Sequence, residues 1–296
     1  MYDIIIIGGG CAGLTAAVYS ARAGKSVLVI EGEAFGGQIT AAPKIENYPA
    51  IGSISGMEFA DSLFSQAEHA GAQFEFSTVT EITDGGIKIV KTEDGEFSAR
   101  SVIIASGSKH RKLGIKDEER FAGHGVSYCA VCDGAFFKGK TAVVAGGGNT
   151  AFSDALYLSA ICEKVYLIHR RSTFRADNVL IERAKNCKNI EIITDTVIKS
   201  LIGNDSLTGI ITESNGMQSE IKTDALFAAV GRIPENEIFK NIVELDSDGY
   251  IIAGEDCRTS AKGIFAAGDC RRKTVRQLTT AAADGACAAS AACAEV

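Results

Sequence analysis

Two cysteines separated by two residues carry the most evident chemistry of this sequence. Cys129 and Cys132 are followed at once by Asp133, in the segment Cys-Ala-Val-Cys-Asp-Gly. This spacing can bring two sulfurs within disulfide distance and place the first at a helix N-terminus, where a thiolate is stabilised. A carboxylic acid beside them could protonate the sulfur that leaves during thiol–disulfide exchange. The pattern therefore predicts a redox-active disulfide with Asp133 as its general acid.

Plainer interpretations of this segment stay open. Half of a structural zinc site would need two further ligands at related spacing, and the sequence has no second Cys-x-x-Cys, so we predict no metal site. The two cysteines could also be ordinary core residues, and Asp133 could cap a helix. We expect the remaining cysteines, which include Cys287 and Cys293, to be small apolar side chains.

Two glycine-rich turns predict two sites for nucleotides. Each follows a short buried strand, over 3–7 and 141–145, and opens a helix with the pattern G-x-G-x-x-G/A. The first position allows a tight turn, the second lets backbone N–H groups approach a pyrophosphate, and the third packs the helix against the strand. Similar turns without a ligand are the alternative. The matched positions are Gly8 and Gly146, Gly10 and Gly148, and Gly13 and Ala151.

The residue that ends the next strand distinguishes the two nucleotides. Glu31 in the first copy can accept hydrogen bonds from ribose hydroxyls and would repel a 2′-phosphate. His169 takes its place in the second copy and is followed by Arg170, Arg171 and Arg175, whose guanidiniums suit a phosphate dianion. The second site is therefore predicted to prefer NADPH to NADH, unless these arginines are only a solvated strand end.

The first site could hold the ADP moiety of either FAD or NAD. The pair Gly268-Asp269 follows a predicted strand in a segment that returns to the first domain. An aspartate there can bind the ribityl chain of a flavin, which favours FAD. A chain that holds FAD and NADPH is expected to transfer hydride from nicotinamide to isoalloxazine.

The repeat predicts an α/β fold with two Rossmann-like domains of the three-layer ββα type, the second inserted into the first. Each βαβ unit is followed by a hairpin, marked by Asp94-Gly95 in the first copy and Asn215-Gly216 in the second. Each copy then closes with a buried strand and a glycine turn. Beyond about residue 240 the sequence predicts a hairpin near Asp248-Gly249 and an alanine-rich helix from about Gln277.

Composition excludes several classes of protein. The 296 residues are 46% hydrophobic and 23% charged, which is the range of globular domains, and length alone suggests two of them. A net charge of −7 offers no cationic face for nucleic acid. The longest apolar stretches are far shorter than the roughly 20 residues that span a bilayer. With no secretory signal visible, we expect a cytoplasmic protein whose cysteines are mostly reduced.

Several motifs in order resemble the low-molecular-weight, bacterial-type thioredoxin reductase family over essentially the whole chain. The turns and the Cys-x-x-Cys-Asp segment belong to this set. The other matching segments are Gly36-Gly37-Gln38, Glu46-Asn47-Tyr48-Pro49, His169-Arg170-Arg171, Phe174-Arg175-Ala176, Gly268-Asp269 and Arg276-Gln277.

The resemblance implies a discontinuous FAD-binding domain over 1–111 and 242–296, and an NADPH-binding domain with the dithiol over 112–241. It implies that Cys132 faces the flavin, that Cys129 exchanges with thioredoxin, and that Asp133 is the general acid. Arg170, Arg171 and Arg175 would bind the 2′-phosphate. The positions implied to contact FAD beyond the glycine turn are Gln38, Asn47, Asp269, Arg276 and Gln277.

The same resemblance implies a homodimer. Because nicotinamide and the cysteine pair would share the inserted domain and both must reach one flavin, we also expect that domain to rotate about crossings near 112 and 241. Some residues depart from the family pattern: Cys11 stands where proline is common, Ser153-Asp154 replaces a pair of glutamates, and Ser106 replaces threonine. Two other functions stay open, a ferredoxin-linked thioredoxin reductase of the same fold and a non-catalytic flavin and NADPH redox-sensing module.

Overall fold

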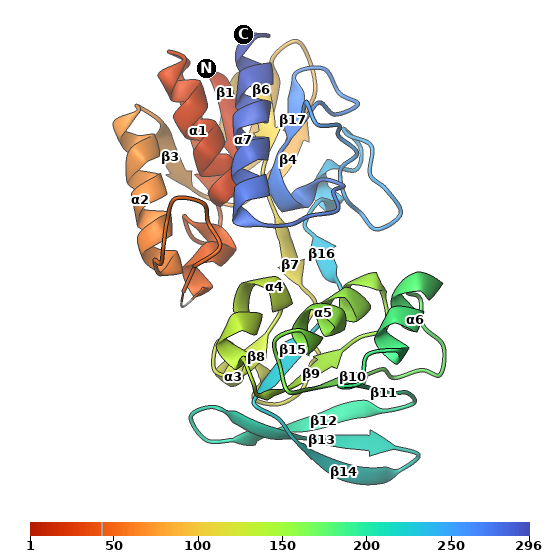
Figure 1. Ribbon diagram of the computed structural model, residues 1–296. Helices are drawn as coiled ribbons and strands as arrows, with labels where there is room; N and C mark the ends of the chain where they lie inside the picture. The colour runs from red at the N-terminus through yellow and green to blue at the C-terminus, as the bar shows by residue number, and fades with distance from the viewer. Residues whose placement is uncertain (43) are drawn as a thin grey trace. The chain divides into compact units, whose positions relative to one another are not determined.

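The computed structural model describes residues 1–42 and 44–296, and these residues form two compact units (Figure 1). We call Met1–Lys109 with Ile233–Val296 the split unit, and His110–Arg232 the inserted unit. The second crossing lies at Arg232 and Ile233, earlier than the expected position near 241. The reason is that Phe239 is buried in the core of the split unit, which draws the segment after Ile233 into that unit.

The split unit is built on one sheet with a parallel part and an antiparallel part. The strand order is β3-β2-β1-β6-β5-β4, with β17 also paired to β6. Strands β1, β2, β3, β6 and β17 run parallel, whereas β4, β5 and the first half of β6 form an antiparallel meander. The strands are β1 (Tyr2–Ile7), β2 (Val27–Glu31), β3 (Gln73–Phe76), β4 (Val79–Thr83), β5 (Lys88–Thr92), β6 (Glu96–Ile104) and β17 (Ile264–Ala266).

Alternating side chains of β1 separate the two faces of this sheet. Ile4 and Ile6 pack with the helices, whereas Ile5 and Ile7 pack toward the meander. Small residues allow α1 and α7 to lie side by side in Figure 1: a Cβ on Gly285 would lie 2.2 Å from the carbonyl oxygen of Ala12. The helices of this unit are α1 (Cys11–Arg22), α2 (Gly56–His69) and α7 (Leu278–Cys293), with one-turn 3₁₀ segments η1 (Gly37–Ala41), η3 (Glu237–Phe239) and η4 (Gly268–Cys270).

The inserted unit repeats this architecture. Its parallel sheet has the order β11-β10-β9-β15-β8, and β12, β13 and β14 form a separate antiparallel sheet. The strands are β8 (Val126–Ser127), β9 (Thr141–Ala145), β10 (Lys164–Ile168), β11 (Ile190–Ile193), β12 (Val197–Gly203), β13 (Leu207–Ser214), β14 (Met217–Lys222) and β15 (Ala225–Ala228). The helical segments are α3 (Glu118–Phe121), α4 (Ala130–Asp133), η2 (Gly134–Phe137), α5 (Asn149–Ser159) and α6 (Asn178–Lys185).

The same two-faced packing recurs here. Val144 of β9 packs with α5 and α6, and its neighbour Val143 packs toward the meander. The chain enters and leaves this unit through β7 (Ser108–His110) and β16 (Arg232–Pro234), which pair with each other. The predicted fold class, α/β with two Rossmann-like units, is therefore confirmed.

The turn signals were also informative. Asn215 and Gly216 both have positive φ, 50° and 78°, as the tight hairpin between β13 and β14 requires. The segment near Asp248 forms a turn closed by an isolated bridge between Leu245 and Ile251 instead of a regular hairpin. Over the described residues, no helix is both long enough and apolar enough to cross a membrane.

Candidate active site

The structure joins Cys129 and Cys132 by a disulfide with an S–S distance of 2.07 Å. Cys129 follows β8 and is the N-cap of the one-turn helix α4, and its sulfur accepts the backbone N–H of Cys132 at 3.2 Å. Cys132 is exposed, and Cys129 is half-buried. The spacing that suggested a disulfide thus places both cysteines at a one-turn helix, with one of the two residues exposed.

The Asp133 side chain binds Ser127 and makes no capping hydrogen bond. The Ser127 hydroxyl donates to Oδ2 of Asp133 at 2.6 Å and accepts the backbone N–H of Cys129 at 3.1 Å. Burial raises the pKa of the Asp133 carboxyl, and the bond from Ser127 opposes this shift. No hydrogen bond from a helix N-terminus reaches this side chain. Asp133 therefore occupies the N-cap position of η2, but its side chain makes no capping hydrogen bond and lies beside the disulfide.

The disulfide turn packs on the helix that opens at the second glycine turn. A Cβ on Gly134 would lie 2.9 Å from Leu158 Cδ2 of α5, so the turn and this helix are in close contact. On the same helix, burial raises the pKa of Asp154 to about 7. Asp154 is one of the two residues that depart from the family's pair of glutamates.

The second glycine turn is tight on one side and open on the other. A Cβ on Gly146 would lie 2.4 Å from the carbonyl oxygen of Ala229 and 2.7 Å from Cβ of Ala151. A Cβ on Gly148 would meet nothing within 4 Å. Helix α5 begins after Gly148 without a side-chain cap, so its first N–H groups are not used by a capping residue.

The predicted 2′-phosphate residues lie at the carboxyl end of β10. The His169 ring lies against the turn: a Cβ on Gly147 would be 2.3 Å from its Cε1. The Arg175 N–H donates to the Gly147 carbonyl at 2.8 Å. Arg170, Arg171 and Arg175 are exposed, and none of them forms an ion pair with a carboxylate in the described part of the chain. Three cations therefore remain available beside the turn.

The first glycine turn has the same construction. A Cβ on Gly13 would lie 1.9 Å from the Gly8 carbonyl oxygen, whereas a Cβ on Gly10 would meet nothing within 4 Å. Helix α1 also begins without a side-chain cap. Glu31 accepts the N–H of Gly9 at 2.6 Å and that of Glu33 at 2.8 Å, so its carboxylate is fixed at the end of β2 beside the turn.

Two further segments predicted to contact a flavin lie against this turn. A Cβ on Gly37, which precedes Gln38, would lie 3.3 Å from Cα of Gly10. A Cβ on Gly268, which precedes Asp269, would lie 2.8 Å from Cβ of Ala12. The Gln38 amide itself donates to the Ser108 carbonyl. The structure therefore brings Gln38 and Asp269 to the N-terminus of α1.

The remaining predicted flavin residues form two groups. The Asn47 amide donates to Oε1 of Gln277 at 3.1 Å, which links residues far apart in the sequence. The Arg276 guanidinium donates to the carbonyls of Lys273 and Arg271, at 3.0 and 3.4 Å, and lies 4.2 Å above the ring of Tyr250. Two of the Arg276 nitrogens thus bind its own loop, next to Gln277 in the sequence.

Both turns suit the nucleotides that the sequence predicts. Each presents an open glycine, Gly10 or Gly148, and an uncapped helix N-terminus, where a pyrophosphate would find backbone N–H donors and no Cβ in its way. The carboxylate of Glu31 suits ribose hydroxyls, and the arginines after β10 suit an added phosphate. The residues present therefore fit FAD in the split unit and NADPH in the inserted unit.

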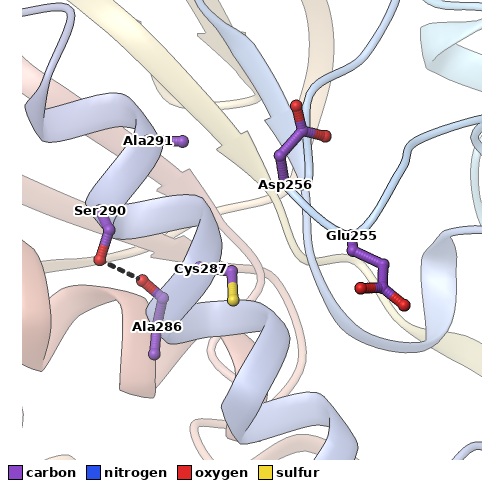
Figure 2. Close-up of a pocket in the computed structure, with 6 residues that line it drawn as sticks. All are labelled: Glu255, Asp256, Ala286, Cys287, Ser290 and Ala291. Atoms are coloured by element: carbon purple, nitrogen blue, oxygen red, sulfur yellow. Dashed lines mark hydrogen bonds between the residues drawn. The ribbon is translucent and has the colours of Figure 1, made fainter.

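The other cysteines do not form a second redox pair. Four are buried, and burial raises the pKa of Cys11 and of Cys270 to about 11, so both stay protonated at neutral pH. Cys287 is exposed, contrary to expectation, and lies on α7 at a pocket of about 350 Å³ that Figure 2 shows. None of the predicted site residues lines this pocket. In the described ranges, no three His, Cys, Asp or Glu side chains gather to hold a metal ion.

Sequence reasoning missed Ser127 and Asn236. Ser127 is the only group in the described chain that we find bonded to both Asp133 and the Cys129 N–H, and its place two residues before Cys129 was the available signal. Asn236 is buried, accepts the Ser106 hydroxyl at 3.1 Å and donates to the Cys270 carbonyl at 2.8 Å. It holds the turn that carries Asp269, and no local pattern marks it.

Two repeated nucleotide-binding units, one of which carries a disulfide in a Cys-x-x-Cys turn, define a nucleotide-dependent disulfide oxidoreductase. The chain belongs to the pyridine nucleotide-disulphide oxidoreductase family, whose model matches residues 2–285.

Named relatives resemble this chain along nearly its full length. It is 42% identical to a thioredoxin reductase of Bacillus subtilis, covering 98% of this chain and 93% of that protein, and 42% identical to one of Treponema pallidum, covering 98% and 96%. The chain is also similar to the crystal structure of thioredoxin reductase from Streptococcus pyogenes, with 41% sequence identity and a TM-score of 0.95. The match covers 100% of this chain and 98% of that one.

Proposed function

We propose that this protein is a flavoprotein disulfide reductase that uses NADPH to reduce the disulfide of thioredoxin or a thioredoxin-like protein. The overall reaction converts NADPH, one proton and the oxidised partner into NADP⁺ and the partner's dithiol. The observation that carries the proposal is the Cys129–Cys132 disulfide in the same unit as a nucleotide turn flanked by Arg170 and Arg171. The thioredoxin reductases that resemble the chain over nearly its whole length support the choice of partner.

The two nucleotides have separate roles and separate residues. In the split unit the residues that would hold FAD are those of the Gly8–Gly13 turn, Glu31, Gln38, Asn47, Asp269, Arg276 and Gln277. In the inserted unit the Gly146–Ala151 turn, His169, Arg170, Arg171 and Arg175 would hold NADPH. A bound flavin supplies the means to accept hydride from nicotinamide and to return its two electrons to a disulfide.

The chain's own residues handle the sulfurs and the protons. Two electrons and two protons convert the Cys129–Cys132 disulfide into two thiols. Asp133, held by Ser127 and kept protonated to higher pH by burial, supplies a proton to the sulfur that leaves. The Cys129 thiolate then attacks the partner's disulfide and forms a mixed disulfide. Cys132 attacks the Cys129 sulfur, which restores the internal disulfide and releases the partner with two thiols.

The remaining parts of the proposal concern the whole protein. NADPH and the disulfide share the inserted unit, yet both must reach one flavin and the dithiol must also reach a partner protein. We therefore propose a rotation about the crossings β7 and β16. We further propose a homodimer, by analogy with the family. Seven free cysteines suit the reducing cytoplasm, where we place the protein.

The two alternative functions have less support. A ferredoxin-linked reductase would not need an open Gly148 or three cations after β10, both of which are present. A non-catalytic sensor would not need a carboxyl with a raised pKa beside its disulfide. Neither alternative matches the named relatives.

Anaerobic titration of the flavin-loaded protein tests the proposal. We expect NADPH to bleach the flavin absorbance at much lower concentration than NADH, and oxidised thioredoxin to restore it. Bleaching by reduced ferredoxin but not by NADPH would favour the ferredoxin-linked alternative. Bleaching by NADPH without reoxidation by any thioredoxin-like disulfide would contradict the proposed partner.

A further inference from the structure

Tyr128 is the residue before Cys129, and neither the nucleotides nor the disulfide exchange gives it a role. Its ring stacks on the imidazole of His110, with ring centroids 5.1 Å apart and an interplanar angle of 29°. Its hydroxyl donates to Oε1 of Glu118 at 2.9 Å. The side chain of Tyr128 is therefore held at both ends, directly beside one of the two redox cysteines.

The His110 end of this arrangement belongs to the crossings. His110 is the last residue of β7, and Arg232 is the first residue of β16. Nη2 of Arg232 lies 2.9 Å from Nε2 of His110. Because a guanidinium only donates, Nε2 accepts and the imidazole is neutral. Burial, with the Arg232 charge, lowers the pKa of His110 to about 4, so this state persists at neutral pH.

The Glu118 end belongs to the segment that follows the first crossing. Glu118 is only 3% exposed. Its two carboxylate oxygens accept the backbone N–H groups of Leu113 and Gly114, each at 2.9 Å. The Tyr128 hydroxyl thus joins a carboxylate that is already fixed by the backbone of 113–114. A buried carboxylate with several donors is a rigid anchor because breaking any bond leaves charge unsatisfied.

We propose that Tyr128 is a positioning residue for Cys129, tied through His110 and Arg232 to the two crossings and through Glu118 to the segment after them. Tyr128 and Cys129 share a peptide bond, so holding the Tyr128 side chain restricts the backbone of Cys129, whose N–H donates to Ser127. The crossings and the exchanging sulfur are therefore mechanically connected within the inserted unit. That this matters for exchange with a partner disulfide rests on the proposed function.

The test measures Cys129 reactivity without NADPH, flavin turnover or thioredoxin. In a Cys132→Ser background, the rate of Cys129 alkylation by iodoacetamide is followed by peptide mass spectrometry between pH 6 and 9. Tyr128→Leu loses both the stack and the hydroxyl. We expect it to change the alkylation rate at a given pH by about threefold to tenfold, since aromatic pairs contribute at this level. Tyr128→Phe keeps the stack but loses the bond to Glu118, so its effect should lie between those of the parent and of Tyr128→Leu.

Tyr166→Leu is the matched control, because Tyr166 is also partly buried in the same core cluster but lies on β10. It should lower thermal stability without changing Cys129 alkylation. His110→Leu removes the same stack by changing its other member, the half-buried His110. This variant takes the place of Tyr128→Leu if Tyr128→Leu does not fold. An unchanged rate and midpoint in the folded Leu variants, or an equal change in Tyr166→Leu, would overturn the proposal. A wild-type protein that fails to reduce thioredoxin would instead overturn the proposed function and leave this result standing.

Discussion

Asp133 shows how one residue can be placed for proton transfer by its neighbours. Its carboxyl is bonded to Ser127 and partly buried, and burial raises its pKa above that of an ordinary aspartate. A general acid works only while it is protonated. The activity that depends on Asp133 should therefore be present below its raised pKa and lost as the pH increases through that value.

We expect Asp133→Asn to lower thioredoxin reduction by about a hundredfold, the usual contribution of a general acid, and to remove this alkaline limb. Asp205→Asn, at an exposed turn of the same unit, is the control. The measurement is kcat/KM for thioredoxin against pH. A variant that keeps the wild-type profile would show that the proton comes from elsewhere.

The arginines after β10 are expected to determine the choice of nucleotide. Charge-assisted hydrogen bonds to a phosphate contribute about 1.5–3 kcal/mol each, or about tenfold or more in affinity. Replacing Arg170 and Arg171 by alanine should therefore raise KM for NADPH at least tenfold and leave KM for NADH nearly unchanged. Arg183→Ala, on the exposed side of α6, controls for the loss of charge. Equal effects on both nucleotides would contradict the assignment.

Residue identity could be predicted where a local pattern carries it. The Cys-x-x-Cys spacing, the glycines of both turns and the arginines after β10 are read directly from the sequence. Sequence reasoning missed the bond from Ser127 to Asp133, which forms across the bend between β8 and α4. The same holds for Arg276, whose guanidinium binds carbonyls of its own loop. Side-chain direction depends on tertiary packing, which spacing alone does not fix.

At the scale of elements, we expect two glycines of the first turn to have different roles: Gly13 is needed for the fold, and Gly10 for nucleotide binding. A Cβ at position 13 would lie 1.9 Å from a backbone oxygen, but one at position 10 would touch nothing. Gly10 also has an ordinary φ of −79°. Alanine should therefore disturb the fold at position 13, whereas at position 10 it should obstruct only a pyrophosphate.

We expect the apoprotein of Gly13→Ala to be destabilised by about 1–3 kcal/mol or more, as overpacked sites are. The apoprotein of Gly10→Ala should match the wild type in thermal denaturation and yet bind FAD at least tenfold more weakly, since even one lost charge-assisted hydrogen bond has this effect. Tight flavin binding by Gly10→Ala would mean that the pyrophosphate does not lie on this turn.

Element boundaries were less predictable than element types. Helix α5 begins at Asn149, directly after Gly148, so the second glycine turn already contains the first helical residues. The stretch near Asp248 was predicted as a hairpin on its turn residues alone. It forms isolated bridges instead, since Ile251 pairs with both Leu245 and Arg271 and no second strand runs beside it.

At the scale of the whole molecule, the internal repeat predicted the architecture but not the second crossing. Both units combine a parallel sheet, a meander and covering helices, as two copies of one βαβ pattern imply. The segment around Phe239 has no equivalent in the repeat. Its membership of the split unit follows from burial, which the sequence pattern did not indicate.

The proposed rotation predicts that the distance between the units changes during the cycle. Fluorophores attached through unnatural amino acids at the exposed positions Met57 and Met217, one in each unit, would report it. We expect energy transfer between them to change when NADPH is added anaerobically, and to return when oxidised thioredoxin follows. Energy transfer that stays constant while the protein turns over would contradict the rotation.

The central claim is that electrons from NADPH open the Cys129–Cys132 disulfide, and counting thiols tests it most directly. The chain has nine cysteines, of which seven are free in the oxidised protein. After anaerobic incubation of the flavin-loaded protein with NADPH and quenching in denaturant, we expect the count to rise from seven to nine. A Cys129→Ser, Cys132→Ser double variant should stay at seven under both conditions. A wild-type count that stays at seven while its flavin is fully reduced would contradict the account.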